Sequence, residues 1–270
     1  MAKNEVKKTG KTELSTETGT PDYMKQYGSA GMESIEVSDV ETPRISLLQA
    51  LSPEVEKFSA KQGNFWHNIL SEDLGPSLSI VLVHVEKTAV LWRPRAEGGG
   101  ILARQIGNRW EPSNTKFEVN VGGRTTVWDT KGSVAESRLL DWGANNTPPA
   151  ATAMYNVIMY LPDRPDASPA LMTFAKTALK PFQRILTALK MGNKPSFGLN
   201  FTLSSEKVSN NKGSFFIPKF TMNGVTSEAD CRTYFDMSKV FSGRVIGIGV
   251  SEHDADDGSA TSGSINVEKF

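Results

Sequence analysis

Basic and aromatic side chains gather in one stretch of the chain, between Lys176 and Lys219. Glu206 is the only acidic residue within it. Lys and Arg neutralise phosphates and aromatic rings stack on unpaired bases, so this combination is typical of proteins that bind single-stranded nucleic acid. The candidate binding residues here are Lys176, Lys180, Arg184, Lys190, Lys194, Lys207, Lys212, Phe215 and Lys219.

A second, milder basic stretch runs from Arg93 to Lys131. Trp92 and Trp110 each adjoin an arginine, which favours an exposed strand end or loop for both rings. The candidate binding residues are Trp92, Arg93, Arg95, Arg104, Arg109 and Trp110. The alternative is that the aromatic residues of both stretches pack in the core, because most of them alternate with polar residues as the buried side of a strand does.

The C-terminal segment 252–270 is acidic and ends in Phe270. It resembles the C-terminal tail of single-stranded-DNA-binding proteins of bacteria and tailed phages, in which a flexible acidic segment ends in phenylalanine and docks on replication and repair partners. The resemblance implies an OB-like barrel core with a helix before its last strands. It also implies that partners are contacted by Asp254, Asp256, Asp257 and Phe270. Residues 43–51 look like the opening of uncharacterised phage proteins, which favours a phage origin.

Asp129 and Lys131 form the most enzyme-like fragment of the sequence. They could be half of a metal-dependent nuclease motif if Glu111 or Glu118 supplied a further carboxylate. Short Asp-x-Lys pairs also arise by chance in any charged chain, and the sequence contains no phosphate loop of the P-loop type. We therefore expect a protein that is not an enzyme.

Histidine and cysteine offer no ligand set for a metal ion. The histidines, His67, His84 and His253, are scattered without metal-ligand spacing. Cys231 is the single cysteine, which excludes an internal disulfide framework, and its apolar neighbours favour a buried, unreactive thiol. We expect no cofactor.

The elements that must position the candidate residues are mostly strands. Alternating or β-branched apolar runs predict strands at 80–85, 89–92, 101–104, 117–121, 125–127, 154–161, 171–174, 199–203 and 215–220. The first two of these runs read as a hairpin. Helical spacing predicts one helix from Pro181, with Gly192 as a left-handed cap, and a second over 228–241.

The predicted fold is mainly β with one or two helices, an elaborated OB-like antiparallel barrel, and a β-sandwich is the main alternative. Residues 34–250 form the expected single domain. Polar composition predicts a flexible arm over 1–33 and a flexible acidic tail over 251–270.

The overall composition limits the function classes. The 270 residues carry 30 basic and 30 acidic side chains, so a uniformly basic nucleic-acid coat is excluded and any binding surface needs local charge segregation. No apolar stretch is long enough to span a membrane, and the N-terminus lacks a signal peptide. A soluble protein of the cytoplasm is expected, the host cytoplasm if the chain comes from a phage.

Two function classes remain. The first is a non-catalytic single-stranded-DNA-binding protein in phage DNA replication or recombination, with the acidic tail recruiting partner proteins. The second is a virion or assembly protein whose terminal arms become ordered on assembly; a metal-dependent nuclease comes third. A homo-oligomer is compatible with either of the first two.

Overall fold

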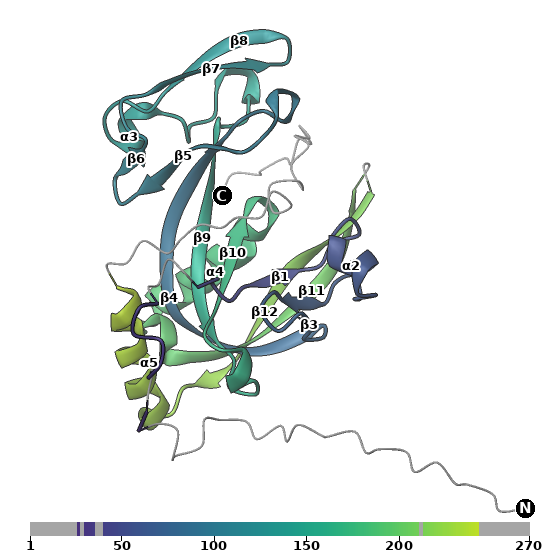
Figure 1. Cartoon of the computed structure of the whole chain (residues 1–270), viewed down its shortest axis with the longest axis vertical. Coiled ribbons are helices and arrows are strands. Elements are labelled where there is room, and N and C mark those ends of the chain that lie inside the picture. The colour runs from purple at the N-terminus through teal and green to yellow at the C-terminus, as the bar shows by residue number, and fades with distance from the viewer. Residues whose placement is uncertain (1–25, 28–29, 36–39, 211–212, 243–270) are drawn as a thin grey trace, which may run out of the picture.

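The computed structural model describes residues 26–27, 30–35, 40–210 and 213–242 (Figure 1). Antiparallel strands are the main regular structure of the described chain, and two long helices pack on them, α4 (Leu179–Met191) and α5 (Glu228–Phe241). The prediction of a mainly β fold with one or two helices is confirmed. The acidic tail 251–270 and most of the N-terminal arm lie outside the described residues.

The main sheet has seven strands. Five follow one another in the order β10-β9-β4-β11-β12, while β5 pairs with β4 and β6 pairs with β5. Their bounds are β4 Ser77–Trp92, β5 Ile101–Ile106, β6 Arg109–Glu111, β9 Ala151–Tyr160, β10 Ala170–Ala175, β11 Leu199–Asn210 and β12 Gly213–Val225.

A three-stranded sheet fills the gap between the two edges of this path. It comprises β1 (Ile45–Leu47), β2 (Phe65–His67) and β3 (Glu72–Asp73), and a single bridge joins Arg44 to Leu171 of β10. On the other side the Gln49 side chain donates to the Phe216 carbonyl of β12 at 3.0 Å and accepts from its N–H at 2.9 Å. The structure is therefore barrel-like, as predicted, but the barrel is not closed, because β10 and β12 do not pair with each other.

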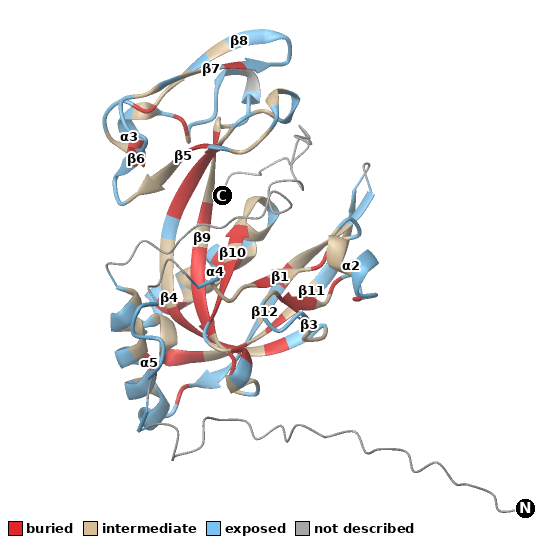
Figure 2. Ribbon diagram, viewed as in Figure 1, coloured by how far each residue is buried: buried red, intermediate tan, exposed pale blue. Residues whose placement is uncertain are grey.

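The larger apolar core lies between the main sheet, the three-stranded sheet and α4. Phe182 of α4 is fully buried and stacks on Phe174 of β10, with ring centroids 4.6 Å apart. Helical spacing puts Ile185, Leu186 and Leu189 on the same side of α4, which explains why this segment is a helix that covers the core. Figure 2 shows the buried residues following β4, β9 and β10.

The C-terminal end of α4 differs from the prediction. Gly192 has φ −81°, so it is not left-handed, and Asn193 takes that conformation instead, with φ 47°. The N–H groups of Asn193 and Lys194 donate to the carbonyls of Lys190 and Leu189, which is the Schellman arrangement. The left-handed cap is therefore shifted by one residue.

Helix α5 covers the opposite face of the sheet. Ser227 caps its N-terminus by accepting from the Asp230 N–H at 3.2 Å. Tyr234 is buried against Val81, Ile158 and Leu171. Cys231 is free and only half-buried, less than the buried thiol that the sequence predicted.

A second apolar cluster lies at the far end of β4 and β9, under a hairpin and a short helix (Figure 1). The hairpin joins β7 (Lys116–Val121) to β8 (Arg124–Asp129) through Gly122 and Gly123, whose φ values of 61° and 82° lie in the left-handed region that glycine adopts without strain. The helix, α3 (Val134–Ser137), begins with a capping box between Ser133 and Glu136.

The prediction that 80–85 and 89–92 form a hairpin is wrong, because β4 continues through both runs as one strand. The stretch from Ser77 to Trp92 contains no Gly, Pro, Asn or Asp to form a turn. A register shift between Leu82 and His84 bends the strand, which then pairs with β9 along most of its length. The remaining elements are α2 (Pro53–Lys57) and the 3₁₀ helices Arg95–Glu97, Ala144–Asn146, Pro165–Ala167, Lys176–Ala178 and Ser196–Gly198.

Candidate nucleic-acid interface

Helix α4 presents a cationic face to solvent. Lys180 and Arg184 are exposed on the side away from Phe182, Lys190 is exposed in the last turn, and Lys194 is exposed just beyond the helix. The helix contains no acidic residue, and these cations make no ion pair within the described part of the chain. A positive charge near a helix N-terminus interacts unfavourably with the helix dipole. Helix stability therefore does not explain why a lysine occupies position 180. We call Lys180, Arg184, Lys190 and Lys194 the α4 cationic face.

The two basic stretches of the sequence begin at the ends of β4 and β10, the two strands that flank β9. Trp92 and Ala175 both pack against Val90 and Met154, which are buried. Their chain neighbours are Arg93, which is exposed, and Lys176, which is half-buried, and they follow the two strands that flank β9. The Trp92 ring is half-buried, so an edge remains available for contact.

The other predicted arginines lie farther along the second cluster. Arg95 is exposed in a 3₁₀ helix, and Arg109 is exposed on β6. Arg104 is paired with Glu111 at 3.5 Å, so part of its charge is compensated. Exposed pairs of this kind are weak, about 0–1 kcal/mol, so Arg104 can exchange Glu111 for a phosphate.

The prediction that Trp110 is exposed is wrong. Its side chain is 2% exposed, and its indole N–H donates to the Ser137 hydroxyl at 2.9 Å. In β6 the exposed Arg109 and Glu111 point one way, so the residue between them points into the second cluster. A ring in this position cannot stack on a base.

The β11–β12 hairpin separates residues that the sequence places together. Phe215 pairs with Val208, whereas Lys207 pairs with Phe216, so Lys207 and Phe215 lie on opposite faces. Lys219 shares the face of Phe215, is exposed and sits 3.8 Å from Glu206. Lys212 lies outside the described residues. Phe220 shares the face of Lys207 and contacts Phe182 of α4, with ring centroids 5.9 Å apart, so only the Lys207 side of the hairpin turns toward α4.

One aromatic residue that the sequence did not single out is a better stacking candidate. Trp142 is 68% exposed on a loop held by hydrogen bonds, from the Asp141 N–H to the Arg138 carbonyl at 3.0 Å and from the Gly143 N–H to the Thr147 carbonyl at 2.9 Å. A signal was present, since Asp141 and Gly143 flank the ring with turn-forming residues rather than with alternating apolar ones.

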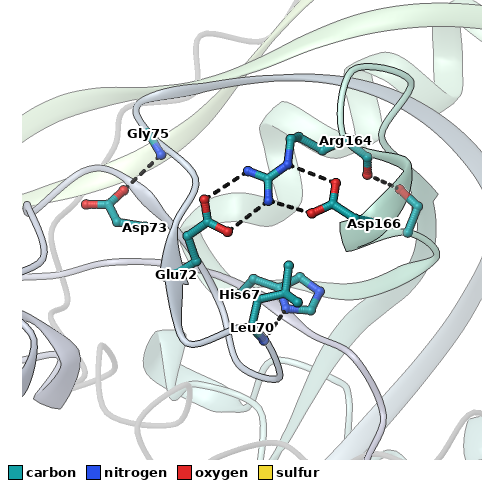
Figure 3. A network of polar contacts seen from close by, with 8 residues as sticks. His67, Leu70, Glu72, Asp73, Gly75, Arg164 and Asp166 are labelled. Atoms are coloured by element: carbon teal, nitrogen blue, oxygen red, sulfur yellow. Dashed lines mark hydrogen bonds and ion pairs between the residues drawn. The ribbon is translucent and has the colours of Figure 1, made fainter. Parts of the chain in front are cut away.

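A polar network away from the cationic face ties the three-stranded sheet to the β9–β10 connection (Figure 3). Arg164 donates to both carboxylate oxygens of Glu72, at 3.0 and 2.8 Å, and to both of Asp166, at 3.0 and 2.8 Å. Hydrogen bonds from Arg164 hold the pKa of Asp166 below its ordinary value. This network positions β2 and β3 at the open edge of the barrel.

His67 lies beneath this network and is almost fully buried. Its Nδ1 accepts from the Leu70 N–H at 3.1 Å, and its Nε2 has no hydrogen-bond partner among the described residues. Burial lowers the pKa of His67 below 6.5, which outweighs the opposite effect of the nearby Ala167 carbonyl. The imidazole is therefore neutral near pH 7.

The described residues include no group of three or more His, Cys, Asp or Glu side chains close enough to share a metal ion. Asp129 Oδ1 accepts from the Lys131 N–H at 2.9 Å, which is a local turn. The Asp129 carboxylate thus closes a turn with its own chain neighbour, and no group of three potential metal ligands includes it in the described part of the chain.

Comparison with protein families identifies the family of the chain but not its biochemical activity. Residues 10–249 match the family model described as Pam3 phage gp34-like protein. The chain belongs to this family. The phage origin expected from residues 43–51 is thereby confirmed. The family description names no biochemical activity, and no curated protein and no solved structure matches the chain.

The part of this phage protein that matches the family model includes the α4 cationic face, both apolar clusters and α5. It stops before the acidic tail at 251–270. Within the described residues, none of the helices combines the length and apolar character that crossing a membrane requires.

Proposed function

We propose that this phage protein binds single-stranded DNA during replication or recombination and does not catalyse a reaction. The observation that carries the proposal is the α4 cationic face, where four exposed cations lie on, or just beyond, a helix without an acidic residue. Surface cations that are not compensated by neighbouring carboxylates are available to replace the counterions of a phosphate backbone.

Aromatic rings supply the preference for single strands. Phosphate contacts alone bind duplex and single-stranded DNA, whereas exposed rings stack only on bases that are already unpaired. Trp142 and the accessible edge of Trp92 support this part of the proposal. One stacked base is worth about 1–3 kcal/mol, so two rings suffice for a measurable preference.

The acidic tail extends the proposal to protein partners. Asp254, Asp256, Asp257 and Phe270 would contact replication or recombination proteins, as the resemblance of the tail implies. They lie outside the described residues, and the proposal for them rests on the sequence alone.

The test measures binding to fluorescent oligo-dT and to duplex DNA over a series of salt concentrations. The proposal expects tighter binding to oligo-dT, with an affinity that falls as salt rises. The double variant Arg184→Ala/Lys190→Ala removes two cations from the α4 cationic face. It should reduce the slope of log K against log salt by about 1.4, at about 0.7 per phosphate contact.

The matched control is Arg232→Ala/Lys239→Ala on α5. It also removes two exposed cations from a helix, but these are paired with Glu228 and Asp236. The control should leave the slope unchanged. Equal slopes in both double variants would place the DNA elsewhere. Binding that is neither tight nor strand-selective would refute the proposal and favour the virion or assembly protein, and degradation of the probe with Mg²⁺ would favour a nuclease.

A further inference from the structure

One face of the strands β4, β9 and β10 turns away from the larger core. Strand registers place its residues in rows: first His84 with Ile158 and Leu171, then Glu86 with Asn156 and Thr173, then Thr88 with Met154 and Ala175. Val90 with Thr152, and finally Trp92, complete it. We call these residues the outer face. Helix α5 covers only its first row, through Tyr234 and Phe241.

Several residues in the rest of the outer face are buried although no described helix lies on them. Val90 is 0% exposed, Met154 is 2% exposed and Asn156 is 0% exposed. The described hydrophobic side chains that pack against Val90 and Met154 are only those of Trp92 and Ala175. A further segment is needed to cover this surface.

Asn156 indicates what kind of segment is needed. Its Oδ1 accepts from the Thr173 hydroxyl at 2.8 Å, but its Nδ2 has no partner among the described residues although it is buried. A buried amide N–H without an acceptor is costly, so a carbonyl oxygen is expected beside it. An extended backbone offers such a carbonyl, whereas a purely apolar side chain does not.

We propose that residues 244–250 of this chain dock on the outer face in an extended conformation. Only Gly243 separates the segment from Ser242, and Phe241 already packs at the near end of the face. Its sequence is Arg-Val-Ile-Gly-Ile-Gly-Val, in which Ile246, Ile248 and Val250 alternate with smaller residues. This alternation supplies one apolar side to a strand that lies flat on Met154 and Val90.

Length and charge agree with this occupant. Seven extended residues span about 23 Å, and the eight steps from His84 to Trp92 along β4 span about 26 Å. The segment carries one charge, on Arg244, at the end nearest to Glu86, which is the one carboxylate of the outer face. The docked segment would thus end beside Trp92 and Arg93.

The test compares two substitutions in the full-length chain. Ile248→Asp places a charge on the side of the segment that faces Met154. It should lower Tm by about 5–10 °C and increase the fluorescence of an added hydrophobic dye. Val245→Asp, on the opposite side of the segment, is the matched control and should change neither measurement. Equal effects of the two substitutions, or no effect of either, would overturn the proposal.

Truncations give a second, independent measurement. A chain ending at Ser251 should keep the Tm of the full chain, whereas a chain ending at Ser242 should bind the dye and melt earlier. A chain ending at Ser242 that keeps its Tm and sediments as a dimer would show that a second copy covers the outer face, and the proposal would fall. None of these measurements involves DNA, so the outcome is separate from that of the proposed function.

Discussion

Phe182 links the stability of the fold to the placement of the α4 cationic face. The ring is fully buried, stacks on Phe174 at 4.6 Å and meets the Tyr155 and Phe220 rings at 5.4 and 5.9 Å. Phe182→Ala removes all these contacts and leaves a cavity between α4 and the sheet. Substitutions of this type cost about 3–5 kcal/mol, since lost burial and the cavity both contribute. For a chain of this size the cost corresponds to a fall in Tm of about 6–20 °C.

The assay is urea unfolding followed by far-UV circular dichroism, with a thermal melt beside it. Gln183→Ala is the matched control, because residue 183 is the next on α4 and is exposed. Alanine has a slightly higher helix propensity, so the control should keep or slightly raise the free energy of unfolding. A loss below 1 kcal/mol in Phe182→Ala, or an equal loss in both variants, would show that α4 does not cover the core as described.

The remaining predictions concern the rings, the buried histidine and the tail. Trp142→Ala should weaken oligo-dT binding by about 1–3 kcal/mol at unchanged Tm, whereas Trp110→Ala should lower Tm; the opposite pattern would contradict the exposures of the two rings. Because burial lowers the pKa of His67 below 6.5, the unfolded chain takes up a proton first, and the free energy of unfolding should fall as the pH drops below 6.5. His67→Gln should flatten that fall in urea titrations at several pH values, and an unchanged pH profile would exclude His67 as its source. Deleting residues 252–270 should tighten oligo-dT binding most at low salt, because an acidic tether no longer competes; weaker binding at every salt concentration would contradict this.

Local patterns in the sequence predict the elements whose own residues determine them. The apolar stripe of α4, the Ser227 cap of α5 and the Gly122–Gly123 turn each depend on side chains a few residues apart. The continuous strand β4 could not be predicted in this way, because its continuity depends on pairing with strands far away in the sequence. Lys87 and Thr88 interrupt an apolar run, but β4 continues through them because it pairs with β9 on one side and β5 on the other.

The candidate site was harder to predict because it depends on strand register. Two tryptophans beside arginines look alike in the sequence, yet Trp110 points inward and Trp92 lies at a strand end. Lys207 and Phe215 belong to different strands, and only the pairing of Val208 with Phe215 shows that they face opposite ways. A shift of the pairing by one residue would reverse this, and no local signal fixes it.

The long strands β4 and β9 belong to both apolar clusters at once. Leu82 and Val157 pack in the larger cluster, while Leu91 and Ala151 pack in the second cluster on the same two strands. A hydrogen-bonded ladder runs between these positions without a break for a linker. Neither half can therefore melt and leave the other with an intact sheet, so hydrogen exchange in the two clusters should share one global opening. A destabilising mutation near Trp142 would then lower the free energy of unfolding of the whole protein, including the part that contains α4 and its cations.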